Sequence, residues 1–158
     1  MGAGILPFIK HKSIFFLILA KEQNSNLWSD FGGTSTKGES YLKTAIREGY
    51  EETDGLLGNK IELNNKVIKN LKKTYCTYDN RYKTYMFEMN FNEGIYFIKY
   101  FNNHRKFIEK NKLIINKEGM YEKSEIKLFT IHDLIDNYNQ IRPFYREIID
   151  QIIIDQTI

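Results

Sequence analysis

The sequence has 158 residues, a formal net charge of +3 and one cysteine, and 42% of its residues are hydrophobic. This length corresponds to a single domain with one core, and the composition excludes the disordered and fibrous classes. Because one cysteine cannot form an internal disulfide, and because the sequence shows neither a signal-peptide pattern nor an apolar run of about 20 residues, we expect a cytoplasmic protein without a membrane segment.

Two apolar runs lie at the start of the chain. Residues 3–9 and 13–20 are rich in Ile and Phe, and the polar residues His11 and Lys12 separate them. Short apolar runs bounded in this way are typical of neighbouring strands, so we expect a hairpin or a meander. The polar residues 22–30 then predict a loop.

A helix is expected over residues 41–53. Apolar and small residues recur at spacings of three and four from Leu42 to Gly49, which places them on one face of a helix. Ser40 is suited to cap the N-terminus of this helix, and Gly55 lies where the helix would end.

The rest of the chain alternates between apolar runs and amphipathic segments. We predict strands at residues 67–77 and 83–91, a helix at residues 99–112, a strand at residues 127–130 and a terminal helix at residues 143–154. Because strands and helices alternate without a repeat or a low-complexity linker, residues 1–158 are expected to form a single α/β domain.

Three glutamates stand close together in the predicted helix: Glu48, Glu51 and Glu52, called the glutamate triad below. Positions i, i+3 and i+4 of a helix share one face, so these like charges repel at a cost of about 0.2 to 0.5 kcal/mol for each pair. Arg47 can neutralise only one of them, and a divalent cation would offset the remaining repulsion. Carboxylate ligands without a His or Cys partner favour Mg²⁺ or Mn²⁺.

The alternative interpretation of the glutamate triad is a solvent-exposed acidic helix face without a ligand. The preceding loop argues for a site, because Gly32 and Gly33 allow a positive φ and a close approach of the backbone. The opposite face of the helix is apolar enough to anchor it against a core. A firmly seated acidic face beside a glycine turn is typical of a binding site.

The spacing of the charged residues resembles a known family signature. From Gly33, five residues lead to Glu39 and seven more lead to Arg47, which the glutamate triad follows in register. This pattern resembles the signature G-x5-E-x7-R-E-U-x-E-E-x-G-U of the Nudix hydrolases, the MutT-like pyrophosphohydrolases, in which U is an apolar residue. It covers residues 33–55, and the stretches AGILPFI, FFLILAKE and LWSDFGG are similar to the segments that flank it in that family.

Two positions depart from this signature. Gly49 stands at an apolar position, where it weakens a helix by about 0.5 to 1 kcal/mol relative to Ala but lets another group pack closely. Asp54 stands where the signature has glycine, and Gly55 follows one place later. Neither departure touches a predicted ligand, so both are compatible with activity, and they leave the substrate open.

The resemblance implies a Nudix fold, an α-β-α sandwich with a mixed β-sheet, that binds Mg²⁺ or Mn²⁺. It implies hydrolysis of a nucleoside diphosphate linked to a further group, by attack of water on phosphorus. The glutamate triad and the carbonyl of Gly32 would hold the metal, with Glu52 or Glu48 also near the attacking water. Arg47 would orient a glutamate, and Glu39 would brace the loop or reach a metal through water.

In several branches of the family the general base lies on a later loop. Glu118, Glu122 and Glu125 lie where such a loop is expected, and the last two form an E-x-x-E pair before a short apolar strand. Surface glutamates without a role are the alternative. Lys21, at the end of the second predicted strand, matches a basic residue that reaches a phosphate in the family, and an ordinary surface lysine is equally compatible with this position.

Aromatic residues on the predicted strands are candidates for binding a substrate base. Tyr75, Tyr85 and Phe87 could stack on it, a contact worth about 1 to 3 kcal/mol in nucleic-acid complexes. Most aromatic residues on strands instead belong to a core. Both interpretations stay open at the level of the sequence.

Several substrates are compatible with this chemistry. The leading prediction is a nucleotide-type diphosphate, namely a nucleoside triphosphate, a nucleotide sugar, ADP-ribose or a dinucleoside polyphosphate. One alternative is a diphosphoinositol polyphosphate. Another is the m7G cap of RNA: the modest positive charge of the chain favours this substrate, and the lack of a basic stripe argues against it. A binding module that keeps the fold without catalysis is the non-enzymatic alternative, against which the intact glutamate triad argues. The resemblance also leaves a homodimer open.

Overall fold

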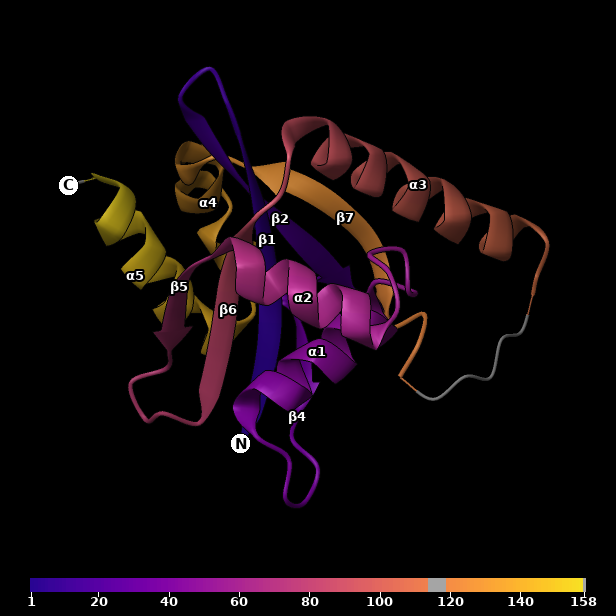
Figure 1. Cartoon of the computed structure of the whole chain (residues 1–158). Helices are drawn as coiled ribbons and strands as arrows, with labels where there is room; N and C mark the ends of the chain where they lie inside the picture. Colours follow the sequence, from indigo (N-terminus) through magenta and orange to yellow (C-terminus); the bar gives the residue numbers. More distant parts are fainter. Residues whose placement is uncertain (114–118, 158) are drawn as a thin grey trace.

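The computed structural model describes residues 1–113 and 119–157, and its strands form one mixed seven-stranded sheet (Figure 1). β1 and β6 are parallel, and every other pair of these strands is antiparallel. The main path of the sheet runs β3-β2-β1-β6-β5, with β4 paired to β1 and β7 paired to β2. The strands are β1 Gly2–His11, β2 Ile14–Glu22, β3 Trp28–Ser29, β4 Phe31–Thr34, β5 Leu71–Cys76, β6 Tyr82–Glu88 and β7 Lys123–Phe129.

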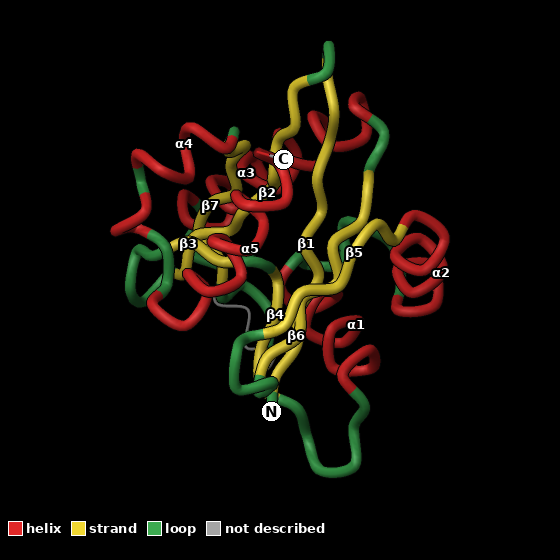
Figure 2. Tube along the Cα trace, turned by 90° about the vertical axis from the view of Figure 1, so that its left-hand side faces the viewer, coloured by secondary structure: helices red, strands yellow, loops and turns green. Residues whose placement is uncertain are grey.

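Helices cover both faces of the sheet, and Figure 2 shows α1 and α2 on one side of the strands and α4 and α5 on the other. One core joins the sheet to α1 Tyr41–Glu52, α2 Lys60–Asn70 and α3 Phe91–Lys110. A second core joins the opposite face to α4 Ile131–Asp136 and α5 Arg146–Thr157. The predicted α-β-α sandwich with a mixed sheet is therefore confirmed. No helix in the described part of the chain is long and apolar enough to cross a bilayer.

The predicted N-terminal hairpin is confirmed. β1 and β2 pair antiparallel near their connection, with Phe8 opposite Leu17, and Lys12 and Ser13 form the turn with φ of 47° and 67°. The first half of β1 pairs with β4 on one edge and with β6 on the other, so β1 is almost entirely buried. The loop predicted at residues 22–30 contains the two-residue strand β3.

The helix predicted at residues 41–53 is confirmed as α1. The side chain of Ser40 accepts a hydrogen bond from the backbone N–H of Lys43 and caps its N-terminus. The position of α1 on the sheet depends on Gly49, because a Cβ there would lie 2.6 Å from Cδ1 of Ile5, which is fully buried in β1. The missing side chain lets α1 pack directly on β1, and this packing sets the position of the glutamate triad.

The strand predicted at residues 67–77 is correct only in its second half. α2 occupies the chain as far as Asn70, because Leu63 and Val67 are buried one helical turn apart. Asn59 caps this helix and forms a capping box with Glu62, so the helix is defined at its start as well. The sequence reasoning took the apolar residues after this cap for strand residues.

Other predicted boundaries are wrong as well. The helix predicted at residues 99–112 starts much earlier, at Phe91, and thereby shortens the strand predicted at residues 83–91. β7 is longer than the predicted strand at residues 127–130 and starts at Lys123. The short α4 was not predicted, and the predicted terminal helix is a 3-10 turn followed by α5. α2 and α4 bury only a few residues each, so their sequences carry a weak periodic signal.

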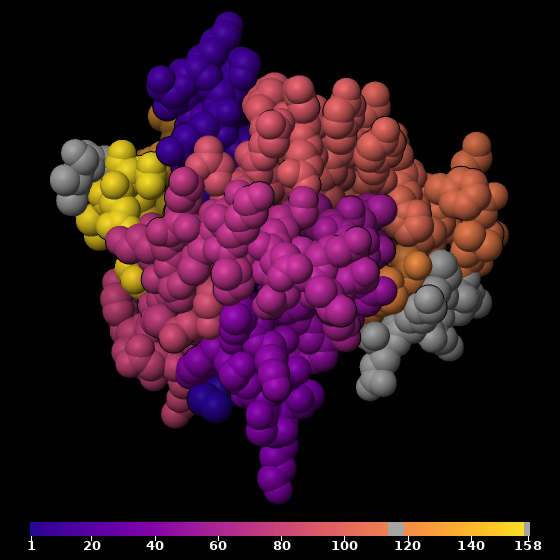
Figure 3. Space-filling view, viewed as in Figure 1, coloured from indigo at the N-terminus to yellow at the C-terminus, as the bar shows by residue number. Residues whose placement is uncertain are grey.

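The connection between β4 and α1 leads into the predicted site. Residues 35–40 project from the body of the molecule, as the purple segment at the lower edge of Figure 3 shows. They join the two glycines of β4 to the N-terminus of α1, so the glycine strand and the acidic helix lie side by side.

Candidate functional site

A cavity of about 620 Å³ lies between β4, α1 and the segment before β7. Five carboxylates and two guanidinium groups line it, from Glu22, Glu48, Glu51, Glu52, Glu122, Arg47 and Arg142. The backbones of Gly32, Gly33 and Gly119 also contribute to its wall. The structure thus brings the glutamate triad, both glycines of the predicted loop and one candidate base to a single cavity. The excess of negative charge opposes an anionic ligand unless a further cation enters with it.

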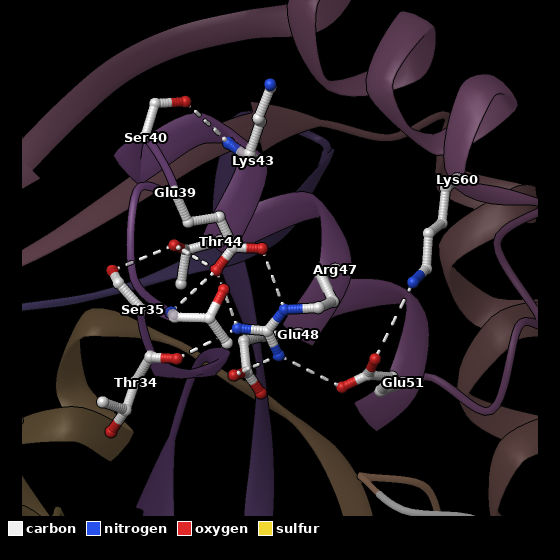
Figure 4. A network of polar contacts seen from close by, with 11 residues as sticks. Thr34, Ser35, Glu39, Ser40, Lys43, Thr44, Arg47, Glu48, Glu51 and Lys60 are labelled. Carbon is white, nitrogen blue, oxygen red and sulfur yellow. Dashed lines mark hydrogen bonds and ion pairs between the residues drawn. The ribbon is translucent and has the colours of Figure 1, made fainter.

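Arg47 lies at the centre of an ion-pair network (Figure 4). Its guanidinium forms a bidentate pair with Glu39, with N–O distances of 3.0 Å for both Nε–Oε1 and Nη2–Oε2. Its Nη1 donates to Oε1 of Glu48 at 2.7 Å and to Oε2 of Glu51 at 3.3 Å. The backbone oxygen of Thr34 accepts a further hydrogen bond at 3.0 Å. One side chain therefore joins the loop to two members of the glutamate triad.

Glu39 holds the connection between β4 and α1 in place. Its carboxylate accepts hydrogen bonds from the backbone N–H of Thr36 at 3.1 Å and from the hydroxyl of Thr44 at 3.0 Å. The hydrogen bond from Arg47 lowers the pKa of Glu39 to about 2, although partial desolvation opposes this. These contacts are those of a residue that braces the loop, and Glu39 does not line the cavity.

Glu52 is the most deeply buried member of the glutamate triad, with 3% of it exposed. Its Oε2 accepts a hydrogen bond from the backbone N–H of Gly32 at 2.6 Å, and it lies 3.3 Å from Nζ of Lys123. Lys123 is fully buried and also contacts Glu22, the last residue of β2. A lysine without solvent thus lies between two carboxylates at the back of the cavity.

Burial controls the charge state of these groups. It raises the pKa of Glu52 well above its ordinary value, and the attraction of Lys123 opposes this only in part. Burial alone would lower the pKa of Lys123, but the neighbouring carboxylates of Glu52 and Glu22 reverse the effect and raise it. Lys123 is therefore charged and supplies an internal cation beside Glu52.

Sequence reasoning missed Lys123, Glu22 and Arg142. The Nη1 of Arg142 donates to Oε1 of Glu22 at 2.9 Å, and its guanidinium lies over the ring of Phe144. Glu22 is the last residue of β2, two positions after its apolar run, and this is the one local signal that it has an unusual environment. Lys123 and Arg142 have no such signal, because they reach the cavity only through the pairing of β7 with β2 and the docking of the C-terminal segment.

Gly33 allows β4 to approach the acidic helix. A Cβ at this position would lie 2.6 Å from the carboxylate of Glu48, so any larger residue would displace that carboxylate. Burial raises the pKa of Glu48, while Arg47 acts in the opposite direction. The close approach that the sequence analysis expected is therefore observed. The positive φ that it also expected is not, because Gly32 and Gly33 are paired with β1 as strand residues.

The oxygen ligands at the cavity suit a hard divalent cation, but they do not converge in this conformation. Among the described residues, no group of three His, Cys, Asp or Glu side chains lies close enough to hold a metal ion. Arg47 engages Glu48 and Glu51, and Nζ of Lys60 lies 3.8 Å from the second oxygen of Glu51. The donor chemistry fits Mg²⁺ or Mn²⁺ once these carboxylates turn from Arg47 toward the cavity.

The candidate bases outside the signature have different locations. Glu122 lines the cavity, and its charge contributes to the raised pKa of Glu48 after burial and the other neighbouring groups. Glu125 lies on β7 outside the cavity lining, where it pairs with Lys21 at 3.3 Å. Lys21 is therefore not directed at the cavity either. Glu118 lies outside the described residues.

The aromatic residues predicted to stack on a substrate base do not line the cavity. Phe87 is fully buried in the core beneath α1 and α2, and Tyr85 packs against the same core. Tyr75 is 2% exposed in the opposite core, and its hydroxyl donates to Asp155 at 2.7 Å. The structure places all three in the packing of the domain, which is the alternative that the sequence left open.

Comparisons with known proteins give structural matches alone, since no protein-family model and no curated protein sequence matches the chain. An Ap4A hydrolase of C. elegans in a binary complex has 16% identity and a TM-score of 0.50, over 86% of this chain and 84% of that one. The Nudix hydrolase RenU of M. smegmatis has 10% identity and a TM-score of 0.50, over 99% of this chain and 85% of that one.

A larger protein also matches. It is a bifunctional NMN adenylyltransferase/ADP ribose pyrophosphatase of Francisella tularensis, complexed with AMP and Mn ion, with 12% identity and a TM-score of 0.53. The match covers 98% of this chain and 41% of that chain. At identities this low, similarity of structure establishes the fold and nothing finer.

Proposed function

We propose, from the premise that this chain has the Nudix fold, that it is a metal-dependent pyrophosphohydrolase acting on a nucleotide-type diphosphate. The observation that carries the proposal is that the charged residues of the signature, with the exception of Glu39, line one cavity. The glutamate triad, Arg47 and both loop glycines line it, although the signature was read from spacing alone. A solvent-exposed acidic helix face would not have its central arginine and buried glutamate engaged in this way.

The charge of the cavity supports a requirement for Mg²⁺ or Mn²⁺. Its five carboxylates would repel a diphosphate, and the two arginines are already paired with glutamates. A bound divalent ion would neutralise the diphosphate and lower the pKa of the attacking water. The Francisella tularensis structure, whose bound molecules are AMP and a Mn ion, is consistent with this choice.

The residues of this chain would divide the work as follows. Glu48, Glu51 and the carbonyl of Gly32 would hold the metal together with Glu52, whose Oε1 is left after Oε2 has engaged the Gly32 N–H and Lys123. Arg47 would orient the two outer glutamates. Glu122, on the segment before β7, would accept the proton of the attacking water.

The size of the cavity supports a small-molecule substrate, since about 620 Å³ lies within the range of ligand pockets. The names of the matching structures include hydrolases of Ap4A and of ADP ribose. A dinucleoside polyphosphate and ADP-ribose are therefore the first substrates to test, with a nucleoside triphosphate and a nucleotide sugar beside them. A cytoplasmic location and a homodimer remain predictions.

The test is a turnover assay with the wild-type protein and the Glu52→Gln variant in Mg²⁺ and in Mn²⁺. The substrates are Ap4A, ADP-ribose, a nucleoside triphosphate, a nucleotide sugar, capped RNA and an inositol pyrophosphate. We expect cleavage of at least one nucleotide and a loss of about 10² to 10⁴-fold in kcat for E52Q. E109Q, a change of the same kind at an exposed position of α3, is the matched control and should retain full turnover.

Three results would contradict the proposal. Equal turnover by E52Q and the wild type would show that the glutamate triad has no part in catalysis. Undiminished turnover in EDTA would show that the reaction does not depend on a metal ion. No cleavage of any substrate, with nucleotide binding retained, would favour a binding module over an enzyme.

A further inference from the structure

The segment that carries Glu122 to the cavity, residues 119–122, is held by contacts from three elements. Gly119 packs against the end of α1, where a Cβ on it would lie 2.5 Å from Oε2 of Glu51. The backbone N–H of Tyr121 donates to Oδ1 of Asp54 at 3.1 Å. On the other side, the backbone N–H of Gln23 donates to the carbonyl oxygen of Glu122 at 3.0 Å. The backbone is therefore fixed at the N–H of Tyr121, one residue before Glu122, and at the carbonyl of Glu122 itself.

Aromatic and polar contacts with α3 complete this frame. The ring of Tyr121 lies against the ring of His104, with centroids 5.9 Å apart, and the guanidinium of Arg105 lies 5.4 Å from the same ring. Nη2 of Arg105 donates to Oε1 of Gln23 at 3.2 Å. Arg105 is 4% exposed, so this bridge from α3 to the end of β2 is inside the protein.

Asp54 is the contact that the family signature does not explain. Its φ is 53°, a left-handed conformation that favours the glycine of the signature, and its side chain is 1% exposed. Its Oδ2 has no hydrogen-bond partner in the described part of the chain, and Nε2 of His104 lies 3.9 Å away. An aspartate here therefore carries backbone strain and desolvation that glycine would avoid.

The Asp54 side chain offsets this cost by accepting the hydrogen bond from the backbone N–H of Tyr121. We propose that Asp54 is a positioning residue that fixes Glu122 at the cavity by holding the backbone N–H of Tyr121, the residue before it. The turn that ends the helix of the glutamate triad then also sets the position of Glu122 at the cavity. The inference deepens the proposed function and rests on it for the role of Glu122, whereas the fixing of the segment can be tested without any substrate.

The first test is hydrogen exchange of residues 119–126 in the metal-free protein. D54G keeps the left-handed backbone without strain and removes only the acceptor, while D54N keeps an acceptor oxygen. We expect exchange at least about tenfold faster in D54G and close to wild type in D54N. K12G, which also places glycine at an exposed left-handed position, is the matched control and should leave this segment unchanged. Unchanged exchange in D54G would overturn the proposal.

The second test is a double-mutant cycle with E122Q, using the nucleotide that the wild type hydrolyses fastest. We expect kcat to fall about tenfold in D54G with an unchanged KM, and to remain within about threefold of wild type in D54N. If Asp54 acts through Glu122, D54G/E122Q will be no slower than E122Q alone. Losses that multiply would overturn the proposal. If the wild type hydrolyses nothing, the proposed function fails, and the exchange experiment still decides whether Asp54 holds the segment.

Discussion

Asp30, the residue before β4, is a buried carboxyl group with a defined set of partners. It is 1% exposed and accepts hydrogen bonds from the hydroxyls of Tyr82 and Thr84, both at 2.8 Å. Burial raises its pKa to about 6, although the two hydrogen bonds and the charge of Lys123 oppose this. The folded protein therefore retains a proton that the unfolded chain releases near pH 4.

This shift predicts a pH dependence of stability. A carboxyl group whose pKa is raised by folding contributes most below its unfolded pKa, and this contribution is lost as the pH rises through about 6. We expect the free energy of unfolding of the wild type, relative to D30N, to fall by about 2 kcal/mol from about pH 4 to about pH 7. Urea unfolding of both proteins in EDTA measures this difference, in which groups common to both cancel. A difference independent of pH would refute it.

At the scale of elements, the contact of α1 with β1 positions the site. Gly49 lies over Ile5, and no room exists between them for a methyl group. An alanine at this position would improve helix propensity by up to about 1 kcal/mol. Its methyl group would also overpack the contact with Ile5, which is fully buried in β1 and has no room to move away. Such overpacking costs about 1 to 3 kcal/mol.

We therefore predict that G49A lowers the free energy of unfolding, in spite of its better helix propensity, and also lowers kcat, because α1 is displaced together with the glutamate triad. Denaturant unfolding and the turnover assay measure the two effects. I5V removes Cδ1, the atom nearest to the added methyl group. G49A should consequently cost less in the I5V background than in the wild type. Additive costs would mean that Ile5 is not the source of the conflict.

The other elements differ in how far local sequence specifies them. α1 has a cap, a regular apolar face and a glycine end, and its predicted bounds differ from the observed ones by one residue at the C-terminus. α2 also has a cap, but its apolar residues are few and continue directly into β5, so periodicity did not separate the two. α3 is buried at scattered positions, and its first turns were taken for strand.

The whole molecule should respond to metal because the glutamates of its cavity repel one another without one. A ligand that binds only the folded state stabilises it by about 2.7 kcal/mol at 100 times its Kd. We expect Mn²⁺ to raise the free energy of unfolding of the wild type by this amount and to have little effect on E48Q/E51Q. Thermal unfolding with and without Mn²⁺ measures the shift, and E109Q should behave as the wild type. An equal shift in E48Q/E51Q would place the metal elsewhere.

The spacing of residues 33–55 determined the core of the candidate site, because a helix of known pitch puts the glutamate triad on one face whatever surrounds it. The same reasoning predicted the alternation of strands and helices and the requirement for glycine before the acidic helix. These features depend on local geometry, which a short stretch of sequence contains in full.

The tertiary structure alone decided what surrounds that face. Strand pairing brings Lys123 to Glu52 and to Glu22, and the docking of the C-terminal segment brings Arg142 to Glu22. These residues are separated in the chain by distances over which periodicity carries no information. The tertiary structure also decided that Tyr75 and Phe87 are core residues, because the burial of a strand face depends on which helices cover it. The side chain of Asp54 acquires its partner in the same way, since Tyr121 reaches it only in the folded chain.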